Sequence, residues 1–415
     1  MSSSITPPTS RALFLDPGPL RPLVDQFSRC LASQGHTVLT VRGYEDVARH
    51  FAAWLQQSGT AVANIDNDTC AAFAAHHCRC PGGRRANRIS TKYAHRVRRF
   101  VQFLSACGAV SPTTPPDPTF VAPRVGLFQD WLRRHRGISE RTIDRYGRMV
   151  MRLVAALGAE PAGYEASLIR QAVLDEVKDT SAAYAKTITT ALRCHLRFLG
   201  ASGECRQELI HAVPTVPQWR LSALPRYLPL DDVERLIAAC DTSKACGIRD
   251  RAILLLLSRL GLRAGDVLGL RLDHICWADG TLRVSGKGRR EVCLPLPQDA
   301  GDALLDYICR ARPTTECDVV FLRSCAPYRP FAVSSSISSV VKLALARAGI
   351  SDPPSHGANL LRHSAATSML RAGATLDTIG TVLRHRSATT TAHYAKVDIP
   401  MLLQVVQPWP EQLSC

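Results

Sequence analysis

Two proline-rich stretches constrain the fold of this chain more than any other feature. "SPTTPPDPTFVAP" covers residues 111–123, and "VPTVPQWRLSALPRYLP" covers residues 213–229. Proline removes a backbone donor and fixes φ, so neither stretch is expected to form the interior of a helix. We interpret both as linkers between three domains, residues 18–110, 124–212 and 226–405. A chain of 415 residues is long enough for two or three such domains.

The first two domains share a helical pattern. "TVRGYEDVARHFAAWL" (40–55) aligns with "TIDRYGRMVMRLVAAL" (142–157), and apolar residues recur at helical spacing in both. Thr40 and Thr142 are predicted as helix N-caps. The pattern indicates an internal duplication, although two convergent four-helix units would look much the same.

The third domain has a mixed pattern. "RDRAILLLLSRLGLRAGDVLGL" predicts a helix, a break at Gly261 and a second helix. "GTLRVSGKGRREVCLPLP" alternates apolar and polar residues around a glycine-containing turn, which predicts a β-hairpin. From residue 333 the pattern is helical again. The expected fold class is therefore mostly α, with two helical N-terminal domains and an α+β C-terminal domain that carries a small β-hairpin or sheet.

The charge of the chain favours a polyanionic partner. Lys and Arg outnumber Asp and Glu by 51 to 35, a net charge of +16, which suits double-stranded DNA, although a generically basic protein is the alternative. The stretch "GGRRANRISTKYAHRVRRF" (82–100) contains no acidic residue. It predicts phosphate contacts, with a merely solvated helix face as the alternative. Its cations are Arg84, Arg85, Arg88, Lys92, Arg96, Arg98 and Arg99.

The cysteines and histidines predict neither disulfides nor a metal site. The chain has 15 cysteines and shows no export signal, so we expect free thiols in a reducing cytoplasm. "HHCRC" contains His76, His77, Cys78 and Cys80, but no second pair follows at a usual metal-ligand spacing. We therefore expect no metal and no cofactor. No apolar run reaches the length of a membrane span, so no membrane association is expected.

Four pieces of the third domain resemble the tyrosine recombinase (phage integrase-like, Xer-like) family in order and separation. Arg263 in "GLRAGDVLGLRLDHI" is similar to the first-arginine motif, and Lys287 in "SGKGRR" stands where the family places its catalytic lysine. Arg362 in "LLRHSAATSML" is similar to the second-arginine motif. His385 and Tyr394 in "LRHRSATTTAHYAKV" are similar to the final histidine and the nucleophile.

The resemblance implies a site-specific recombinase or integrase. Such an enzyme cleaves and rejoins DNA through a 3′-phosphotyrosine without metal or ATP, for integration, excision or transposition of a mobile element. It implies a homo- or hetero-tetramer on two DNA sites, and it makes the two helical domains core-binding-like DNA-binding domains. A type IB topoisomerase shares the chemistry, but the doubled helical region favours a recombinase. A catalytically weakened DNA-binding protein on a recombinase scaffold is the alternative.

The residue types fit this chemistry on physical grounds. Arginine gives bidentate contacts to phosphate and does not lose its charge, so Arg263 and Arg362 suit a phosphorane-like transition state. A phenolate of Tyr394 would attack phosphorus, and Lys287 fits a general acid for the 5′ oxygen. Arg289 and Arg290 are neighbouring cations that would contact DNA or replace Lys287 in that role.

Two positions depart from the family pattern. The family usually has histidine three residues before the second arginine, where this chain has Asn359, which can donate a hydrogen bond but cannot act as a base. Arg384 stands where the family usually has glycine and is expected to add a cation near the site. We assign supporting roles to Asp266, which would orient Arg263 or a helix end, and to His363. The proton of Tyr394 would then pass to His385 or water.

Overall fold

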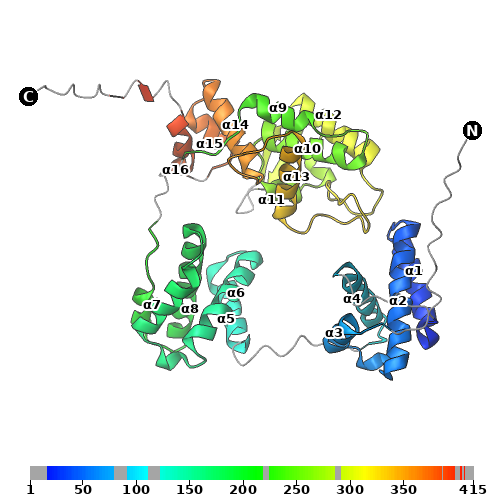
Figure 1. The fold of residues 1–415 in the computed structure, drawn as a ribbon. Helices are drawn as coiled ribbons and strands as arrows, with labels where there is room; N and C mark the ends of the chain where they lie inside the picture. The colour runs from blue at the N-terminus through cyan, green and yellow to red at the C-terminus, as the bar shows by residue number, and fades with distance from the viewer. Residues whose placement is uncertain are drawn as a thin grey trace, which may run out of the picture. The chain divides into compact units, whose positions relative to one another are not determined.

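The computed structural model describes residues 16–78, 91–110, 122–217, 224–285, 291–385, 387–397, 402–403 and 406. Within these ranges the protein is mostly helical with one three-stranded antiparallel sheet (Figure 1), which confirms the predicted mostly-α class with a small sheet. The chain divides into two compact units, residues 112–222, and residues 1–111 together with 223–415. In the part of the chain that is described, no helix is both long and apolar enough to cross a membrane.

The N-terminal helices pack around an aromatic core. They are α1 (Arg21–Ser33), α2 (Val38–Ser58), α3 (Asn67–Ala75) and α4 (Thr91–Ala106). Phe27, Phe51 and Phe100 are buried at their centre. Helix α2 begins after Thr37, whose Oγ1 accepts the backbone N–H of Thr40 at 3.4 Å. The predicted N-cap Thr40 is therefore wrong by three residues, because Thr37 already satisfies that donor.

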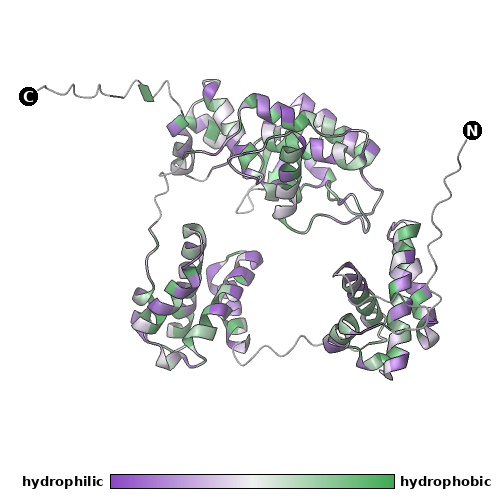
Figure 2. Cartoon of the chain, viewed as in Figure 1, coloured by the Kyte–Doolittle hydropathy of each residue, from purple (hydrophilic) through white to green (hydrophobic). Residues whose placement is uncertain are grey.

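The helices of the second unit form a separate core. They are α5 (Ala122–Arg136), α6 (Glu140–Leu157), α7 (Ala166–Val177) and α8 (Ala182–Ala201), followed by a 3₁₀ segment at Gln207–Ala212. Figure 2 shows hydrophobic residues on the sides of these helices that face one another. Ser139 is the N-cap position of α6, so the cap again lies three residues before the predicted Thr142.

The C-terminal part surrounds one buried helix, α10 (Ala245–Arg259). Ile253–Leu257 of α10 are almost fully buried, which explains their uninterrupted apolar sequence. The strands β1 (Ile275–Cys276), β2 (Thr281–Ser285) and β3 (Glu291–Pro295) pair antiparallel, with Leu282 opposite Leu294, so the predicted hairpin strands are confirmed. The remaining α-helices are α9 (Leu230–Ala238), α11 (Ala264–Leu268), α12 (Gln298–Asp306), α13 (Ser334–Arg347), α14 (Asn359–Arg371), α15 (Leu376–Val382) and α16 (Ala388–Thr391).

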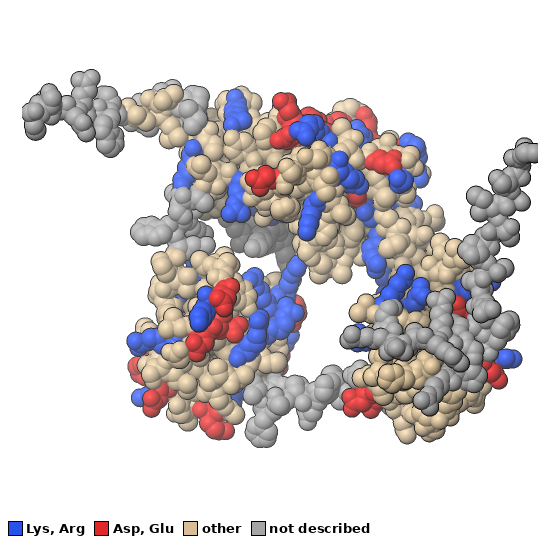
Figure 3. Space-filling view, in the orientation of Figure 1, with Lys and Arg blue, Asp and Glu red and all other residues tan. Residues whose placement is uncertain are grey.

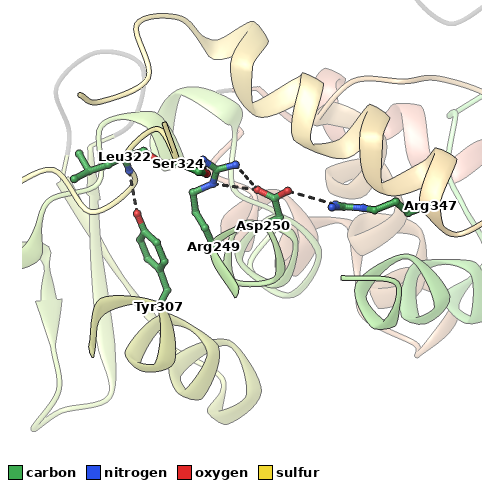
Figure 4. Close-up of polar contacts among 6 residues, drawn as sticks. All are labelled: Arg249, Asp250, Tyr307, Leu322, Ser324 and Arg347. Carbon is green, nitrogen blue, oxygen red and sulfur yellow. Dashed lines mark hydrogen bonds and ion pairs between the residues drawn. The ribbon is translucent and has the colours of Figure 1, made fainter. Parts of the chain in front are cut away.

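A buried ionic network fixes α10 to its surroundings (Figure 4). Arg249 Nη2 donates to Asp250 Oδ1 at 2.6 Å, and its Nη1 donates to the Leu322 carbonyl at 3.1 Å. Arg347 on α13 pairs with Asp250 Oδ2 at 3.4 Å, and the N–H of Leu322 donates to the Tyr307 hydroxyl at 3.1 Å. Because a buried charge without a partner is strongly destabilising, this network specifies how α10, α13 and the loop at Leu322 pack.

Candidate active site

The break predicted at Gly261 positions the first arginine. Gly261 has φ 56, a conformation that side chains other than glycine rarely adopt. A Cβ at this position would also lie 2.4 Å from Leu383 Cδ2. Helix α11 starts directly after Arg263, and Asp266 Oδ2 accepts the backbone N–H of Arg263 at 2.8 Å. Asp266 thus holds a helix end, one of the two roles expected for it.

Arg263 and Arg362 meet at one backbone carbonyl. Arg263 Nη2 donates to the oxygen of Leu383 at 3.5 Å and to that of Arg384 at 3.1 Å. Arg362 donates to the carbonyls of Gly261 and Leu383. These contacts fix both guanidinium groups beside the turn that follows α15. Burial, aided by the charge of Arg263, lowers the pKa of Arg362 to about 10, so Arg362 is cationic at neutral pH.

Arg384 is less available than the sequence suggested. It has φ 55, so a non-glycine residue occupies the left-handed region at the position where glycine was expected. Its guanidinium pairs with the Asp266 carboxylate, and the two side chains are only 7% and 6% exposed. Asp266 therefore compensates the added cation and connects α11 to the turn after α15. The expected gain in positive charge at the site is offset by this ion pair.

Tyr394 lies in the 3₁₀ segment Ala392–Val397, directly after α16. Ser387 caps α16 by accepting the N–H of Thr389 at 3.2 Å. His385 precedes this helix and is bonded through Nδ1 to Thr391 Oγ1 at 2.9 Å. The rings of His385 and Tyr394 are parallel, with their centroids 6.2 Å apart. The fold therefore brings the final histidine beside the tyrosine.

The structure places His363 in contact with Tyr394, which the sequence did not predict. Its Nδ1 lies 2.8 Å from the Tyr394 hydroxyl oxygen. Burial lowers the pKa of His363 to about 4, so the neutral imidazole can accept a proton at neutral pH. Burial raises the pKa of Tyr394, while Arg362 and Arg263 oppose that rise. Sequence reasoning missed this pair because a contact between residues in α14 and after α16 depends on the tertiary fold.

The remaining predicted catalytic positions are only partly described. Asn359 is exposed and is the first residue of α14, one helical turn before Arg362. Lys287, Arg289 and Arg290 lie outside the described residues, between strands β2 and β3.

The predicted DNA contacts of the first helical group differ in their availability. Arg84, Arg85 and Arg88 lie outside the described residues, and Lys92 on α4 is exposed. Arg96 donates to the Gly43 carbonyl at 2.9 Å, and Arg99 donates to Gln34 Oε1 at 2.8 Å. These two arginines are half-buried against α2 and its preceding turn, so part of the predicted basic face stabilises its own helices.

A second basic face was missed in the sequence. Exposed arginines on α6 follow the helical spacing i, i+4, i+7 and i+11, which places them on one side. They are Arg141, Arg145, Arg148 and Arg152. Figure 3 shows Lys and Arg side chains gathered over α5 and α6 on the visible face of this unit. The signal was present in the arginine spacing of residues 141–152, whereas the prediction rested on apolar spacing alone.

Comparison with known proteins decides the family. Residues 226–399 match the model of the phage integrase family. The chain is 36% identical over 400 residues to y4rA of Sinorhizobium fredii (strain NBRC 101917 / NGR234), named as an integrase/recombinase, with 95% of each chain covered. The chain belongs to the phage integrase family. It is a site-specific tyrosine recombinase that acts on DNA.

Further relatives agree with this assignment. The tyrosine recombinase XerD of Lacticaseibacillus casei is 33% identical over 242 residues, which cover 57% of this chain and 80% of XerD. A lambda integrase dimer bound to a COC′ core site has a similar fold, with a TM-score of 0.53 and 19% identity over 70% of this chain and 97% of that chain. XerH bound to a palindromic difH substrate gives a TM-score of 0.54 and 18% identity, over 69% of this chain and 85% of that chain.

Proposed function

We propose that this recombinase cleaves DNA with Tyr394 as the nucleophile and His363 as its base. The observation that carries the proposal is the 2.8 Å contact between His363 Nδ1 and the Tyr394 hydroxyl, beside the two arginines that converge on Leu383. This arrangement supplies a proton acceptor and two cations around one hydroxyl group. Positioned donors and acceptors of this kind stabilise the charge that develops in a transition state.

The cleavage step balances with these groups. The Tyr394 proton passes to His363 as Oη bonds to phosphorus, and the bond from phosphorus to the 5′ oxygen breaks. The products are a 3′-phosphotyrosyl ester and a free 5′ hydroxyl, whose proton we assign to Lys287. Attack by a 5′ hydroxyl reverses the step and rejoins DNA, so the ester conserves the bond energy and no ATP is required.

We assign the phosphate oxygens to Arg263, Arg362 and His385. Each guanidinium carries five N–H donors in a planar fork, which suits bidentate contact with a phosphate. Burial, aided by Arg362 and Arg263, lowers the pKa of His385 to about 4, so it would donate as a neutral imidazole. Asn359 would add an amide donor from the start of α14.

We infer that the two helical domains, residues 18–110 and 124–212, are core-binding-like and contact DNA, with residues 226–405 as the catalytic domain. The exposed arginine face of α6 and Lys92 on α4 support contacts to phosphate. We further propose assembly as a homo- or hetero-tetramer on two DNA sites, for integration, excision or transposition of a mobile element. The described cysteines form no disulfide, which fits a cytoplasmic protein.

A selection on random DNA tests the proposal without a known target. The substrates are duplexes with a randomised core and a nick just 3′ of each candidate scissile phosphate. Cleavage beside the nick releases a short fragment that carries the 5′ hydroxyl, so religation cannot occur and the covalent adduct is trapped. Wild-type protein is expected to form denaturant-resistant adducts whose sequenced DNA shares one motif. Tyr394→Phe is expected to form none, while it retains DNA binding by mobility shift. Equal recovery from both proteins, or none from either, would overturn the assignment of Tyr394.

A further inference from the structure

Three side chains of types that can bind a metal converge in the N-terminal helices, and none of them belongs to the recombinase site. His50 projects from α2, His76 follows the last residue of α3, and Cys78 lies two residues later. One ligand atom from each lies within 4.8 Å of the others. The sequence showed only the local cluster "HHCRC"; it could not show that His50, 28 residues before Cys78, completes the group. Exposed His77 is outside this group, and Cys80 lies outside the described residues.

The hydrogen bonds orient both histidines as ligands. His76 Nδ1 bonds to the Phe73 carbonyl at 2.5 Å, which fixes the proton on Nδ1 because a carbonyl only accepts. His50 Nδ1 lies 2.6 Å from the Tyr93 hydroxyl. Metal-bound histidines commonly engage their second ring nitrogen in this way. The Nε2 of His50 faces Cys78 Sγ at 3.3 Å.

We propose that His50, His76 and Cys78 bind a zinc ion that fastens the end of α3 to α2. A tetrahedral site with Zn–S of about 2.3 Å and Zn–N of about 2.0 Å places sulfur and nitrogen about 3.5 Å apart. The observed 3.3 Å is close to this separation, so small movements suffice. One thiolate and two imidazoles suit Zn²⁺ better than Mg²⁺ or Ca²⁺, which prefer oxygen.

Binding is a proton exchange at Cys78. The thiol loses its proton to solvent, its sulfur bonds to Zn²⁺, and water fills the fourth position of the tetrahedron. The competing interpretation is a metal-free aromatic core, in which the Cys78 thiol donates to His50 and the rings of Phe73, Trp54 and His76 pack around it.

Metal analysis of the full chain separates the two interpretations. After dialysis against zinc and then against zinc-free buffer, wild-type protein is expected to retain about one zinc ion per chain. Cys78→Ser and His76→Asn are expected to lose it. Two matched controls, Cys107→Ser and His77→Asn, change exposed residues of the same region outside the cluster and are expected to retain it.

Cobalt substitution provides a readout that does not depend on a variant folding. Wild-type protein loaded with Co²⁺ is expected to show a thiolate-to-cobalt charge-transfer band and the intense visible bands of tetrahedral Co²⁺. Removal of zinc by a chelator is expected to lower the Tm of wild type and to leave that of Cys78→Ser unchanged. Absence of zinc and of these bands in wild type, or zinc retained by both Cys78→Ser and His76→Asn, would establish the metal-free core instead.

Discussion

At the residue scale, sequence motifs placed most of the candidate site but not the proton acceptor that we propose. The order of the motifs located Arg263, Arg362, His385 and Tyr394, and the fold brings these four side chains around the turn at Leu383. His363 was assigned only a supporting role. Its contact with Tyr394 joins two helical segments through tertiary packing, and no periodicity in a single chain encodes such a contact.

Replacing His363 by glutamine tests its role as base. The amide can still hydrogen-bond to the Tyr394 hydroxyl but cannot accept its proton, so adduct formation should slow by about 100-fold or more. His393→Gln is the matched control, because its ring centroid lies 6.0 Å from that of Tyr394 while its Nδ1 has no hydrogen-bond partner among the described residues. The rate of adduct formation in a single turnover is measured for both variants. Similar rates in the two variants would remove His363 from the mechanism.

The pH dependence of cleavage follows from the same group. His363 must be neutral to accept a proton, and burial lowers its pKa to about 4. Lowering the pH from neutrality should therefore leave this base active until the pH approaches 4, well below the 6.5 of an ordinary histidine. The rate of adduct formation at sub-saturating DNA reports the free enzyme. A loss of rate with a midpoint near 6.5 would show that another group, or an exposed histidine, is the base.

At the scale of elements, the sequence predicted whether most segments form helices or strands, but it did not predict where these elements begin. Apolar spacing predicted α2, α6 and α10, and alternation predicted strands β2 and β3. The starts of α2 and α6 lay three residues earlier than predicted, because Thr37 and Ser139 are the residues that precede these helices. Val38 and Leu39 in the first turn of α2 are apolar but exposed, so the spacing of buried residues did not mark the start of that helix. The break at Gly261 was predictable, since glycine before an arginine-led helix is a local signal.

Gly261→Ala should disturb both the fold and the site. A positive φ costs a non-glycine residue about 1–2 kcal/mol, and overlap of the new Cβ with Leu383 should add about 1–3 kcal/mol to the loss in unfolding free energy. Gly280→Ala is the matched control, since Gly280 has φ 58 but open space around its Cβ position. Urea unfolding measures the stability of the two variants, and adduct formation measures their activity. Only Gly261→Ala should lose activity, because Leu383 anchors both arginines.

At the scale of the whole molecule, composition predicted the class of partner but not the surface that meets it. The net charge of +16 indicated a polyanion, and family membership establishes action on DNA. The predicted basic stretch 82–100 is partly engaged with its own helices through Arg96 and Arg99. The exposed arginine face of α6 became evident only from the burial of each residue in that helix, because charge counts do not show which cations are exposed.

The contribution of the α6 face can be measured on any duplex, since phosphate contacts do not depend on sequence. Binding to non-specific DNA is expected to weaken as salt is added. The plot of log K for binding against log salt concentration has a negative slope, and its magnitude decreases by about 0.9 for each phosphate contact removed. Arg145→Gln combined with Arg148→Gln should therefore reduce the slope by about 1.8. Arg170→Gln combined with Lys178→Gln removes the same charge from exposed positions at α7, in the same unit, and should leave the slope nearly unchanged. Equal slopes for the two double variants would mean that the basic face contributes through net charge alone, and that the surface that contacts the DNA backbone lies elsewhere.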